Sequence, residues 1–500
     1  MEFFSHLSLG FAQAMSLNNL AYCFLGCLLG TVIGVLPGLG PLATIAMLLP
    51  FSFGLDPLTA LIMLAGVYYG AQYGGSTTAI LIAVPGETSS VVTMLDGHKM
   101  AQQGRAGIAL ATAAIGSFIA GTIGTLFVAL FSIPLSSFAL SFGPAELFSL
   151  MLVGLVGASA MSSSIVKSLG MIIIGIMLGI VGTDLTSGVN RFVFGMPQLW
   201  DGLDIVTVAV GIFALTEVVS QLCNDDKTET ITSRITSLMP TREDIRRMVA
   251  PILRGTGLGV LVGALPGAGA AIASFGSYAM EKKFADDPER LGQGAIEGVA
   301  GPESANNAAA QCAFVPTLTL GIPGSGSMAL MLSIMIINGI QPGPQVIQNN
   351  PDLFWGLIAS MWIGNVMLLV LNLPLIGIWV KLIKIPYTIL FPAILVFSCI
   401  GAYSVNYSTF DLYMLVAFGA FGYVLRKLHF EPAPLMLGFV LGPMMEQYFR
   451  TAMLISKGDF MTFVTKPISL TLLLLAFMLI LVMSMPSNRR RLEDSLTPED

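Results

Sequence analysis

Two stretches of this chain repeat one another, and that repeat constrains the fold more than any other feature. Residues 30–40 read GTVIGVLPGLG and residues 259–269 read GVLVGALPGAG, with six of eleven positions identical. Each is followed by a second Pro-Gly pair inside apolar sequence, AILIAVPGETSS at 79–90 and TLTLGIPGSGS at 317–327. Matching helix breaks in two halves of an apolar chain are typical of the binding site of a secondary transporter.

The composition sets the broad class of the protein. Hydrophobic residues make up 55% of the chain and charged residues 10%, whereas soluble domains carry about 25% charged residues. The apolar runs are long, unlike the alternating segments of about ten residues that form a transmembrane barrel. We therefore expect an all-α polytopic membrane protein that is surrounded by a lipid bilayer and has no nucleic-acid partner.

The longest hydrophilic stretch, at 221–247, divides the chain into two halves. We predict a first membrane half at 1–222, a cytoplasmic linker at 223–250, a second membrane half at 251–486 and a cytoplasmic tail at 487–500. Because a full crossing needs about twenty apolar residues, the apolar segments predict roughly 10–14 transmembrane helices.

Several apolar pieces that flank the breaks are too short to cross a membrane. They lie at 41–50, 75–84, 268–280 and 315–322, and we expect half-helices or the arms of re-entrant hairpins there. The run at 353–383 is long enough for one tilted helix or for two helices broken near Pro374.

The basic residues predict opposite orientations for the two halves. Residues 1–20 contain no Lys or Arg, whereas residues 223–254 contain Lys227, Arg234, Arg242, Arg246, Arg247 and Arg254. Since basic loops stay in the cytoplasm, the first half enters from outside and the second from inside. The two halves then form inverted-topology repeats. The basic residues Arg450, Lys457 and Lys466 precede the final helix and conflict with this assignment, because they would lie outside.

The first break of each half is a Leu-Pro-Gly-x-Gly sequence. Pro37 and Pro266 lack an N–H and interrupt their helices. The helix that restarts beyond each break presents free N–H groups and partial positive charge, which suit an anion. The alternative is a simple kink or close helix packing through glycine. The candidate substrate-binding glycines are Gly38, Gly40, Gly267 and Gly269.

The second breaks add hydroxyl and amide groups, which can bind a carboxylate or offer oxygens to Na⁺. Ordinary hydrogen bonding between helices is the alternative. For the substrate we nominate Thr88, Ser89, Ser325 and Ser327. For the coupling ion we nominate Ser76, Thr77, Thr78, Asn306, Asn307, Glu87 and Glu303.

The two carboxylates leave several functions open. A carboxylate within a membrane is by default a cation ligand or a proton carrier. Glu303 follows Pro302, however, so it could simply favour a helix N-terminus. Glu87 aligns with Ser325, and its charge would repel an anionic substrate unless it is protonated or bound to a cation. We expect Na⁺ as the coupling ion, with H⁺ as the alternative, and no cofactor or other metal.

Enzyme motifs are sparse. The chain has three histidines, and neither an HExxH sequence nor a Walker A motif with its GK[ST] ending occurs. The sequence therefore supports neither zinc proteolysis nor ATP-driven pumping. We expect that the protein is not an enzyme.

Three long stretches resemble the large membrane subunit of the tripartite tricarboxylate transporters (TctA). They are residues 34–87, from GVLPGLGPLATIAML to AILIAVPGE, residues 95–110, LDGHKMAQQGRAGIAL, and residues 294–344, from GAIEGVAGPESANNAAAQ to GIQPGP. The similarity runs over nearly the whole chain.

The resemblance implies the permease subunit of a secondary transporter that depends on a binding protein, in a bacterial inner membrane. It implies a small four-helix membrane subunit and a periplasmic solute-binding protein as partners. Its substrate would be a small carboxylate, a tricarboxylate such as citrate or a related dicarboxylate, taken up by ion-coupled alternating access. The rival interpretation is a passive channel, or a scaffold whose partner holds the substrate site.

Overall fold

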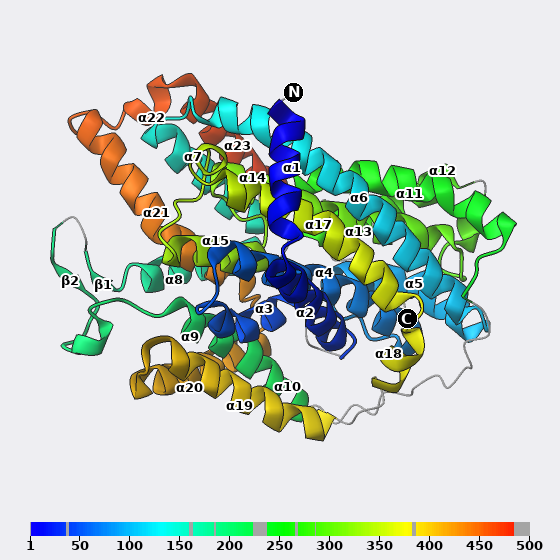
Figure 1. Cartoon of the computed structure of the whole chain (residues 1–500). Coiled ribbons are helices and arrows are strands. Elements are labelled where there is room, and N and C mark those ends of the chain that lie inside the picture. The colour runs from blue at the N-terminus through cyan, green and yellow to red at the C-terminus, as the bar shows by residue number, and fades with distance from the viewer. Residues whose placement is uncertain are drawn as a thin grey trace.

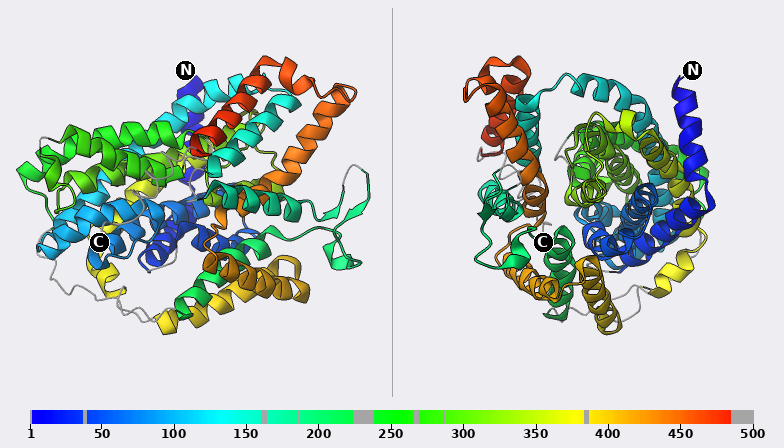
Figure 2. Two further views of the ribbon diagram at one scale, coloured as in Figure 1. Left: turned by 180° about the vertical axis from the view of Figure 1, so that it is seen from behind. Right: turned by 60° about the vertical axis from the view of Figure 1, so that its left-hand side comes forward.

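The computed structural model describes residues 2–36, 40–159, 164–184, 187–223, 238–265, 269–285, 287–382 and 387–484, nearly all of them helical (Figure 1). Within these ranges the strands are β1 (Gly182–Thr183) and β2 (Asn190–Arg191), which pair antiparallel. This hairpin projects from the body of the molecule (Figure 2). The all-α architecture expected from the composition is confirmed.

The helices before residue 224 are α1 (Glu2–Ala14), α2 (Leu17–Gly34), α3 (Pro41–Leu48), α4 (Pro57–Ile82), α5 (Val91–Gln102), α6 (Ala106–Ala139), α7 (Pro144–Ala158), α8 (Ile165–Gly179), α9 (Ile205–Ala209) and α10 (Thr216–Cys223). A π-helix (Val210–Leu215) joins α9 to α10, and short 3₁₀ turns cover Leu49–Ser52, Thr88–Ser90 and Pro197–Leu199.

The later helices are α11 (Arg242–Gly263), α12 (Gly269–Phe284), α13 (Glu297–Cys312), α14 (Phe314–Leu320), α15 (Gly326–Ile337), α16 (Val346–Asn349), α17 (Pro351–Asn372), α18 (Ile376–Leu382), α19 (Tyr387–Asn406), α20 (Thr409–Lys427), α21 (Ala433–Ile455), α22 (Thr462–Thr465) and α23 (Pro467–Ser484). A 3₁₀ turn covers Pro288–Arg290. In the described ranges, the helices α2, α6, α17 and α20 are long and apolar enough to cross a membrane, and shorter apolar helices accompany them.

Three details differ from the expected segments or refine them. Residues 75–82 are not a separate arm, because they form the last turns of α4. The backbone of α2 packs against Gly74, and this close contact stabilises α4 despite the glycine inside it. The run at 353–383 is divided near Pro374, one of the two expected outcomes. Helix α11 already begins at Arg242, within the stretch expected as linker.

Glycine-mediated packing joins the repeated segments to the helices that follow them. On α2, every fourth residue is a glycine that lies against the backbone of α4, in the pairs Gly26–Met63, Gly30–Val67 and Gly34–Ala71. The same pattern joins α11 to α13, in the pairs Gly255–Gly301, Gly259–Ala305 and Gly263–Ala309. In both cases the numbers rise together, so the paired helices are parallel. Positions 63, 67 and 71 differ from 301, 305 and 309 by 238 in every pair, so the two halves share one packing register.

The equivalent helices of the two halves run in opposite directions. The Tyr69 and Phe314 rings lie 5.9 Å apart, and farther along α4 the Ser76 hydroxyl is 2.8 Å from Glu303. Position increases along α4 as it decreases along α13 and α14, so these helices are antiparallel. Equivalent helices of inverted repeats are expected to be antiparallel, although the orientation of each half in a membrane stays a prediction.

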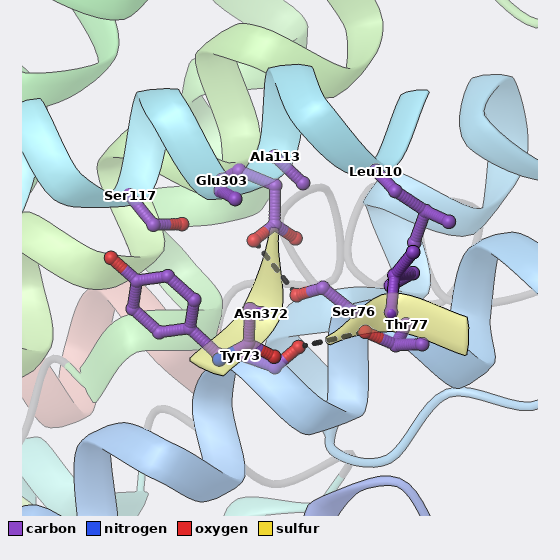
Figure 3. Close-up of a pocket in the computed structure, with 10 residues that line it drawn as sticks. Tyr73, Ser76, Thr77, Leu110, Ala113, Ser117, Glu303 and Asn372 are labelled. Carbon is purple, nitrogen blue, oxygen red and sulfur yellow. Dashed lines mark hydrogen bonds between the residues drawn. The ribbon is translucent and has the colours of Figure 1, made fainter. Parts of the chain in front are cut away.

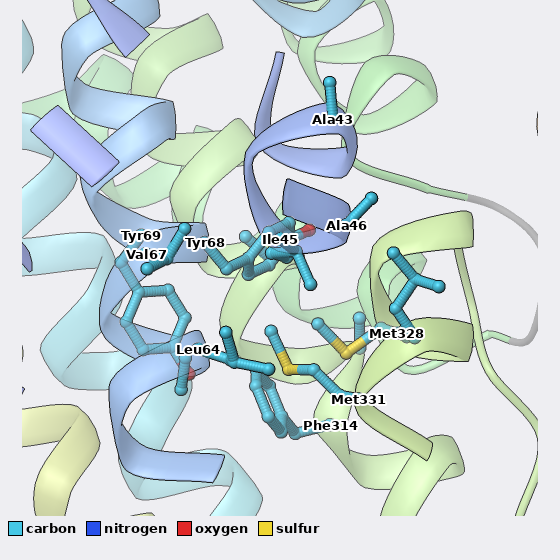
Figure 4. Close-up of a cluster of buried hydrophobic side chains, with 14 of the residues drawn as sticks. Ala43, Ile45, Ala46, Leu64, Val67, Tyr68, Tyr69, Phe314, Met328 and Met331 are labelled. Carbon is cyan, nitrogen blue, oxygen red and sulfur yellow. The ribbon is translucent and has the colours of Figure 1, made fainter. Parts of the chain in front are cut away.

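An apolar core fills the contact between the halves. Ile45 of α3 and Leu64 of α4 meet Phe314 of α14 and two methionines of α15, Met328 and Met331 (Figure 4). Each of these side chains is almost completely buried. The two halves are therefore joined by shared packing close to the second breaks.

The beginning of α6 is tied to the beginning of α11 by an ion pair. Arg105 Nη2 is 2.6 Å from Asp244 Oδ1, and the Gln103 side chain donates to the carbonyl of Gln293. Partial burial favours the neutral carboxyl, but hydrogen bonds from Thr241 and the charge of Arg105 outweigh this effect and lower the pKa of Asp244. This end of the molecule thus contains the α5–α6 junction and the start of α11.

Candidate functional site

The first breaks interrupt both halves, as predicted. Helix α2 ends at Gly34 and α3 begins at Pro41, with extended backbone at Gly40. Helix α11 ends at Gly263 and α12 begins at Gly269, where φ is +67°. A positive φ favours glycine over any residue with a side chain. Gly38 and Gly267 lie outside the described residues.

The second breaks have nearly the same backbone in the two halves. Helix α4 is followed by Ala83 in the left-handed region (φ 55°), and α14 is followed by Gly321 (φ 70°). The chain then reaches Glu87 at φ −153° and ψ 167°, and Ser325 at φ −156° and ψ 169°. Each is the N-cap of the next helical turn, so the alignment of Glu87 with Ser325 holds in three dimensions.

Each second break packs on the short helix that follows the first break of the other half. The Ser274 hydroxyl of α12 lies 2.8 Å from the Ser89 carbonyl and 3.2 Å from the Pro302 carbonyl. Conversely, Gly326, at the start of α15, faces the Leu42 side chain of α3. The four breaks are thereby connected across the contact between the halves.

The half-buried Glu87 carboxylate accepts hydrogen bonds from both halves. Ser89 Oγ donates to Glu87 Oε1, and Asn306 Nδ2 donates to the same oxygen over 3.2 Å. Asn306 is fully buried, and in the described part of the chain its Oδ1 has no hydrogen-bond partner. Its equivalent in the first half, 238 positions earlier, is Tyr68, which lies beside Glu87 and Ser325. Both residues therefore approach the second break of the opposite half.

A second carboxylate, that of Glu303, is completely buried in the middle of α13. Ser76 Oγ donates to Glu303 Oε2 over 2.8 Å (Figure 3). On the other side of the carboxylate, Thr93 Oγ1 donates to Glu303 Oε1 over 2.5 Å. The helix-terminus interpretation of Glu303 is wrong, because α13 begins six residues earlier, at Glu297. In the described part of the chain, no Lys, Arg or His forms an ion pair with Glu303.

A small pocket adjoins the Glu303 carboxylate, and we call it the Glu303 pocket. It is lined by Tyr73, Ser76, Thr77, Leu110, Ala113, Ala114, Ser117, Glu303, Asn372 and Ile376 (Figure 3). Asn307 supports this wall from behind. Its Nδ2 donates to Ser117 Oγ over 2.7 Å and to the Glu303 carbonyl over 3.1 Å.

The other nominated residues are more dispersed. The hydroxyls of Thr77 and Thr78 bond to carbonyls of their own helix, those of Tyr73 and Gly75. Thr88 is exposed, and Ser327 is buried in the first turn of α15. The structure thus groups the nominated coupling-ion residues around Glu87 and around Glu303, with Thr78 outside both groups.

Four polar residues of the Glu303 surroundings were missed by the sequence analysis. Tyr73 lies on α4, three residues before Ser76. Thr93 lies three residues past the second break, Ser117 lies within the long apolar helix α6, and Asn372 lies at the end of α17. Asn372 carried a detectable signal, because it is one of two amides, with Asn365, in a mostly apolar run. Ser117 carried none, since many small hydroxyl residues occur in apolar helices.

Asp96 was also missed. Its carboxylate is fully buried, and Oδ1 accepts three backbone N–H groups, from Gly292, Gly294 and Ala295, each over 2.8 Å. Its other oxygen accepts the Tyr278 hydroxyl at 3.0 Å. These bonds clamp α5 of the first half to the loop before α13 and to α12, so Asp96 has a structural role.

Comparison with known proteins decides the family. The family model "Tripartite tricarboxylate transporter TctA family" matches residues 20–437. The chain belongs to the TctA family of tripartite tricarboxylate transporters. It is also similar to two Agrobacterium vitis proteins. An uncharacterized 52.8 kDa protein in the TAR-I ttuC' 3'region is 53% identical over the full length of both chains. An uncharacterized protein in the TAR-II ttuC' 3'region is 54% identical over 48% of this chain and its own full length. No solved structure matches the chain.

Membership in the TctA family fixes the broad role. The protein is a membrane component of a transporter, and a tripartite system implies further components beside this chain. The resemblance drawn from the three quoted stretches is confirmed. The matched segment includes both first breaks, both second breaks and the Glu303 pocket.

Proposed function

We propose that this chain is the permease subunit of a secondary transporter that depends on a binding protein and imports a small carboxylate. The observation that carries the proposal is the contact between two broken-helix halves, in which each second break packs on the short helix of the other half. Secondary transporters bind substrate at such interfaces, and one half moves against the other around the site. The proposed partners are a small four-helix membrane subunit and a periplasmic solute-binding protein.

The distribution of basic residues supports an orientation in a bacterial inner membrane. One end of the molecule gathers Lys99, Arg105, Arg242, Arg246, Arg247, Lys282, Lys283 and Arg290. By the positive-inside rule this end faces the cytoplasm. Helix α6 starts there and its 34 residues extend about 50 Å, enough to reach the opposite side.

The opposite end carries basic residues that are mostly paired. Arg191 and Arg450 share the carboxylates of Asp184 and Glu446, and Lys466 bonds Glu146. The positive-inside rule counts Lys and Arg and takes little account of acidic partners, so Arg450, Lys457 and Lys466 still conflict with the inverted assignment, which rests on the larger number of basic residues at the first end. The first half would then enter from outside and the second half from inside.

The substrate site would lie between the breaks. Gly40 and Gly269 precede the short helices α3 and α12, and Ser325 caps α15. Free N–H groups at helix starts and nearby hydroxyls suit a carboxylate. Gly38, Gly267, Thr88, Ser89 and Ser327 complete the nominated set. The Glu303 pocket has room for a particle about the size of water and is too small for a carboxylic acid.

The coupling ion would bind near one or both of the two carboxylates, the half-buried Glu87 and the buried Glu303. Na⁺ prefers hard oxygen donors, and Glu87 and Glu303 are surrounded by hydroxyl and amide groups. Proton transfer on Glu87 or Glu303 is the alternative. Full accumulation of substrate in sodium-free medium, driven by a pH gradient alone, would exclude the sodium mechanism.

The test of the proposed function is uptake by the reconstituted complex. Proteoliposomes containing this chain and its small membrane subunit would receive the binding protein and a panel of labelled tricarboxylates and dicarboxylates, with and without a sodium gradient. We expect uptake of one class of carboxylate above the external concentration, dependent on the gradient and on the binding protein. A passive channel would give equilibration without accumulation.

A further inference from the structure

We infer that the Glu303 pocket is a sodium site whose ligands are the oxygens of Glu303, Ser76, Thr77, Ser117 and Asn372. This inference rests on the proposed function, because it names the place and the ligands of the coupling ion. It adds Ser117 and Asn372 to the residues nominated from the sequence. It assigns Glu87 and Asn306 to the separate group at the second breaks.

The first argument is the charge of Glu303. A fully buried carboxylate without a basic partner is costly unless it holds a proton or a bound cation. The described residues contact it with hydroxyl groups, Ser76 at 2.8 Å and Thr93 at 2.5 Å. A hydroxyl that donates its hydrogen to the carboxylate still has lone pairs that can face a cation.

The second argument is an unpartnered oxygen in the wall of the pocket. Asn372 is almost fully buried, and its Nδ2 donates to the Leu368 carbonyl of its own helix over 2.9 Å. That bond fixes the amide and leaves Oδ1 without a hydrogen-bond partner among the residues that the structure describes. A buried polar oxygen without a partner points to a missing ligand. Asn372 lines the same pocket as Glu303 (Figure 3).

The third argument is the orientation of Ser117. Asn307 Nδ2 donates to Ser117 Oγ over 2.7 Å and so holds the serine oxygen in place. An N–H group is a donor only and cannot coordinate a cation, so this amide group supports a ligand without being one. Asn307 is therefore a positioning residue. It also donates to the main-chain carbonyl of Glu303, four residues earlier in α13, so one amide connects Ser117 of α6 to the helix that carries Glu303.

The composition of the pocket favours a monovalent ion. One carboxylate is combined with neutral oxygens, so a single positive charge balances the site. Ca²⁺ usually takes six to eight oxygens, often with several carboxylates. No group of three or more His, Cys, Asp or Glu residues that could hold a metal occurs in the described ranges.

The position of the pocket gives the ion a means of coupling. Its ligands come from α4 and α6 of the first half and from α13 and α17 of the second, so bound sodium would connect the halves. Glu303 directly follows Pro302, whose carbonyl accepts the Ser274 hydroxyl that also bonds Ser89 at the second break. A shift of α13 on ion binding would therefore displace Ser274 and, through it, the second break of the first half at Ser89.

The test measures ion binding on the purified full-length chain, without transport. Thermal unfolding in detergent would be followed as NaCl replaces choline chloride at constant ionic strength, with KCl as a second series. A ligand that binds only the folded state raises Tm as its concentration rises. We expect saturable stabilisation by Na⁺ that K⁺ does not reproduce.

Variants then locate the site. Ser117→Ala and Asn372→Ala should each raise the half-saturating Na⁺ concentration at least about tenfold, and Glu303→Gln should abolish the sodium response. Ser132→Ala is the control for Ser117→Ala, because this buried serine lies on the same helix, α6, but outside the pocket. It should leave the sodium response unchanged.

Two results would overturn the inference. One is a wild-type Tm that responds equally to Na⁺, K⁺ and choline. The other is an unchanged sodium response in both Ser117→Ala and Asn372→Ala, which remains informative even if Glu303→Gln does not fold. Carboxylate uptake that persists without any sodium binding would refute this site while leaving the proposed permease function intact. Sodium binding at these residues in a complex that transports no carboxylate would support the site and refute the proposed permease function.

Discussion

Asp96 shows how strongly one residue can join the two halves. Its carboxylate accepts four hydrogen bonds, three of them from backbone N–H groups of a partly buried loop, at Gly292, Gly294 and Ala295. Each hydrogen bond to a charged group contributes about 1.5–3 kcal/mol, and an abandoned buried donor costs a similar amount. The sequence LDGHKM gives no hint of this, because the partners lie about 200 residues away.

We predict that Asp96→Ala destabilises the folded chain by at least about 3 kcal/mol, seen as a large drop in Tm or in the yield of monodisperse protein. Asp56→Ala is the matched control, since that carboxylate caps α4 through one N–H, at 3.1 Å from Leu58 N. Its loss should cost about 1 kcal/mol. Equal losses for the two variants would show that the Asp96 clamp contributes nothing beyond a helix cap.

The neighbouring asparagines Asn306 and Asn307 should differ in function. Asn307 positions Ser117 and Asn306 bonds Glu87. Asn307→Ala should therefore raise the Na⁺ concentration for half-maximal uptake about tenfold, with a smaller effect on the concentration of substrate required. Asn306→Ala should act mainly on the substrate. Sodium-dependence curves at saturating substrate test this, and a larger sodium effect in Asn306→Ala would reverse the assignment.

At the scale of elements, the glycine register explains why each half holds together. In lipid, apolar side chains give little preference for a neighbouring helix over the bilayer, so close backbone contact through small residues stabilises the pair. The glycines of α2 and α11 occupy equivalent positions and face equivalent residues on α4 and α13. The same repeated segment thus has two roles. Its glycines before the break pack against the next helix, and its Pro-Gly sequence breaks the helix.

Gly259→Val and Gly257→Val form a matched pair on α11. A side chain at Gly259 would collide with the backbone of Ala305, whereas one at the exposed Gly257 meets nothing within 4 Å. We expect Gly259→Val to lower stability by on the order of 3 kcal/mol and Gly257→Val to be nearly neutral. Comparable thermal unfolding of the two variants would contradict the packing register.

The positions of the helix breaks could be predicted from the sequence, but the contacts between residues far apart in the chain could not. The internal repeat placed the breaks before Pro41, Gly269, Glu87 and Ser325, because proline and glycine act locally on the backbone. The hydrogen bond from Ser76 to Glu303 spans 227 positions and depends on the antiparallel packing of two helices. No local pattern encodes that register. The expected arm at 75–84 was wrong in part for the same reason, since the fit of α2 against α4 keeps the helix intact.

For the whole molecule, the two ends differ in how many basic residues they carry. More of them gather around the starts of α6 and α11, where Arg105 and Arg247 form ion pairs, than near β1, β2 and α21, where Arg191 and Arg450 do. Because α4 and α13 are antiparallel, the two halves approach the membrane from opposite sides if this charge asymmetry follows the positive-inside rule.

Cysteine labelling in a cysteine-free background tests this orientation. A cysteine at Val189, which is exposed on the β1–β2 hairpin, should react with an impermeant reagent added outside. A cysteine at Glu289, exposed in the loop before α13, should react only from the cytoplasmic side. Residues 1–10 should behave like Val189, and 225–245 like Glu289. Labelling of both positions from one side would remove the case for inverted halves.

The claim that two broken-helix halves form an alternating carrier is tested most directly by counterflow. Proteoliposomes with the reconstituted complex are loaded with unlabelled carboxylate and diluted into a trace of the labelled compound, without an ion gradient. A carrier with one alternating site exchanges internal for external substrate, so we predict transient accumulation of label above its equilibrium level. A monotonic approach to equilibrium, at a rate that does not depend on the internal substrate, would contradict the account.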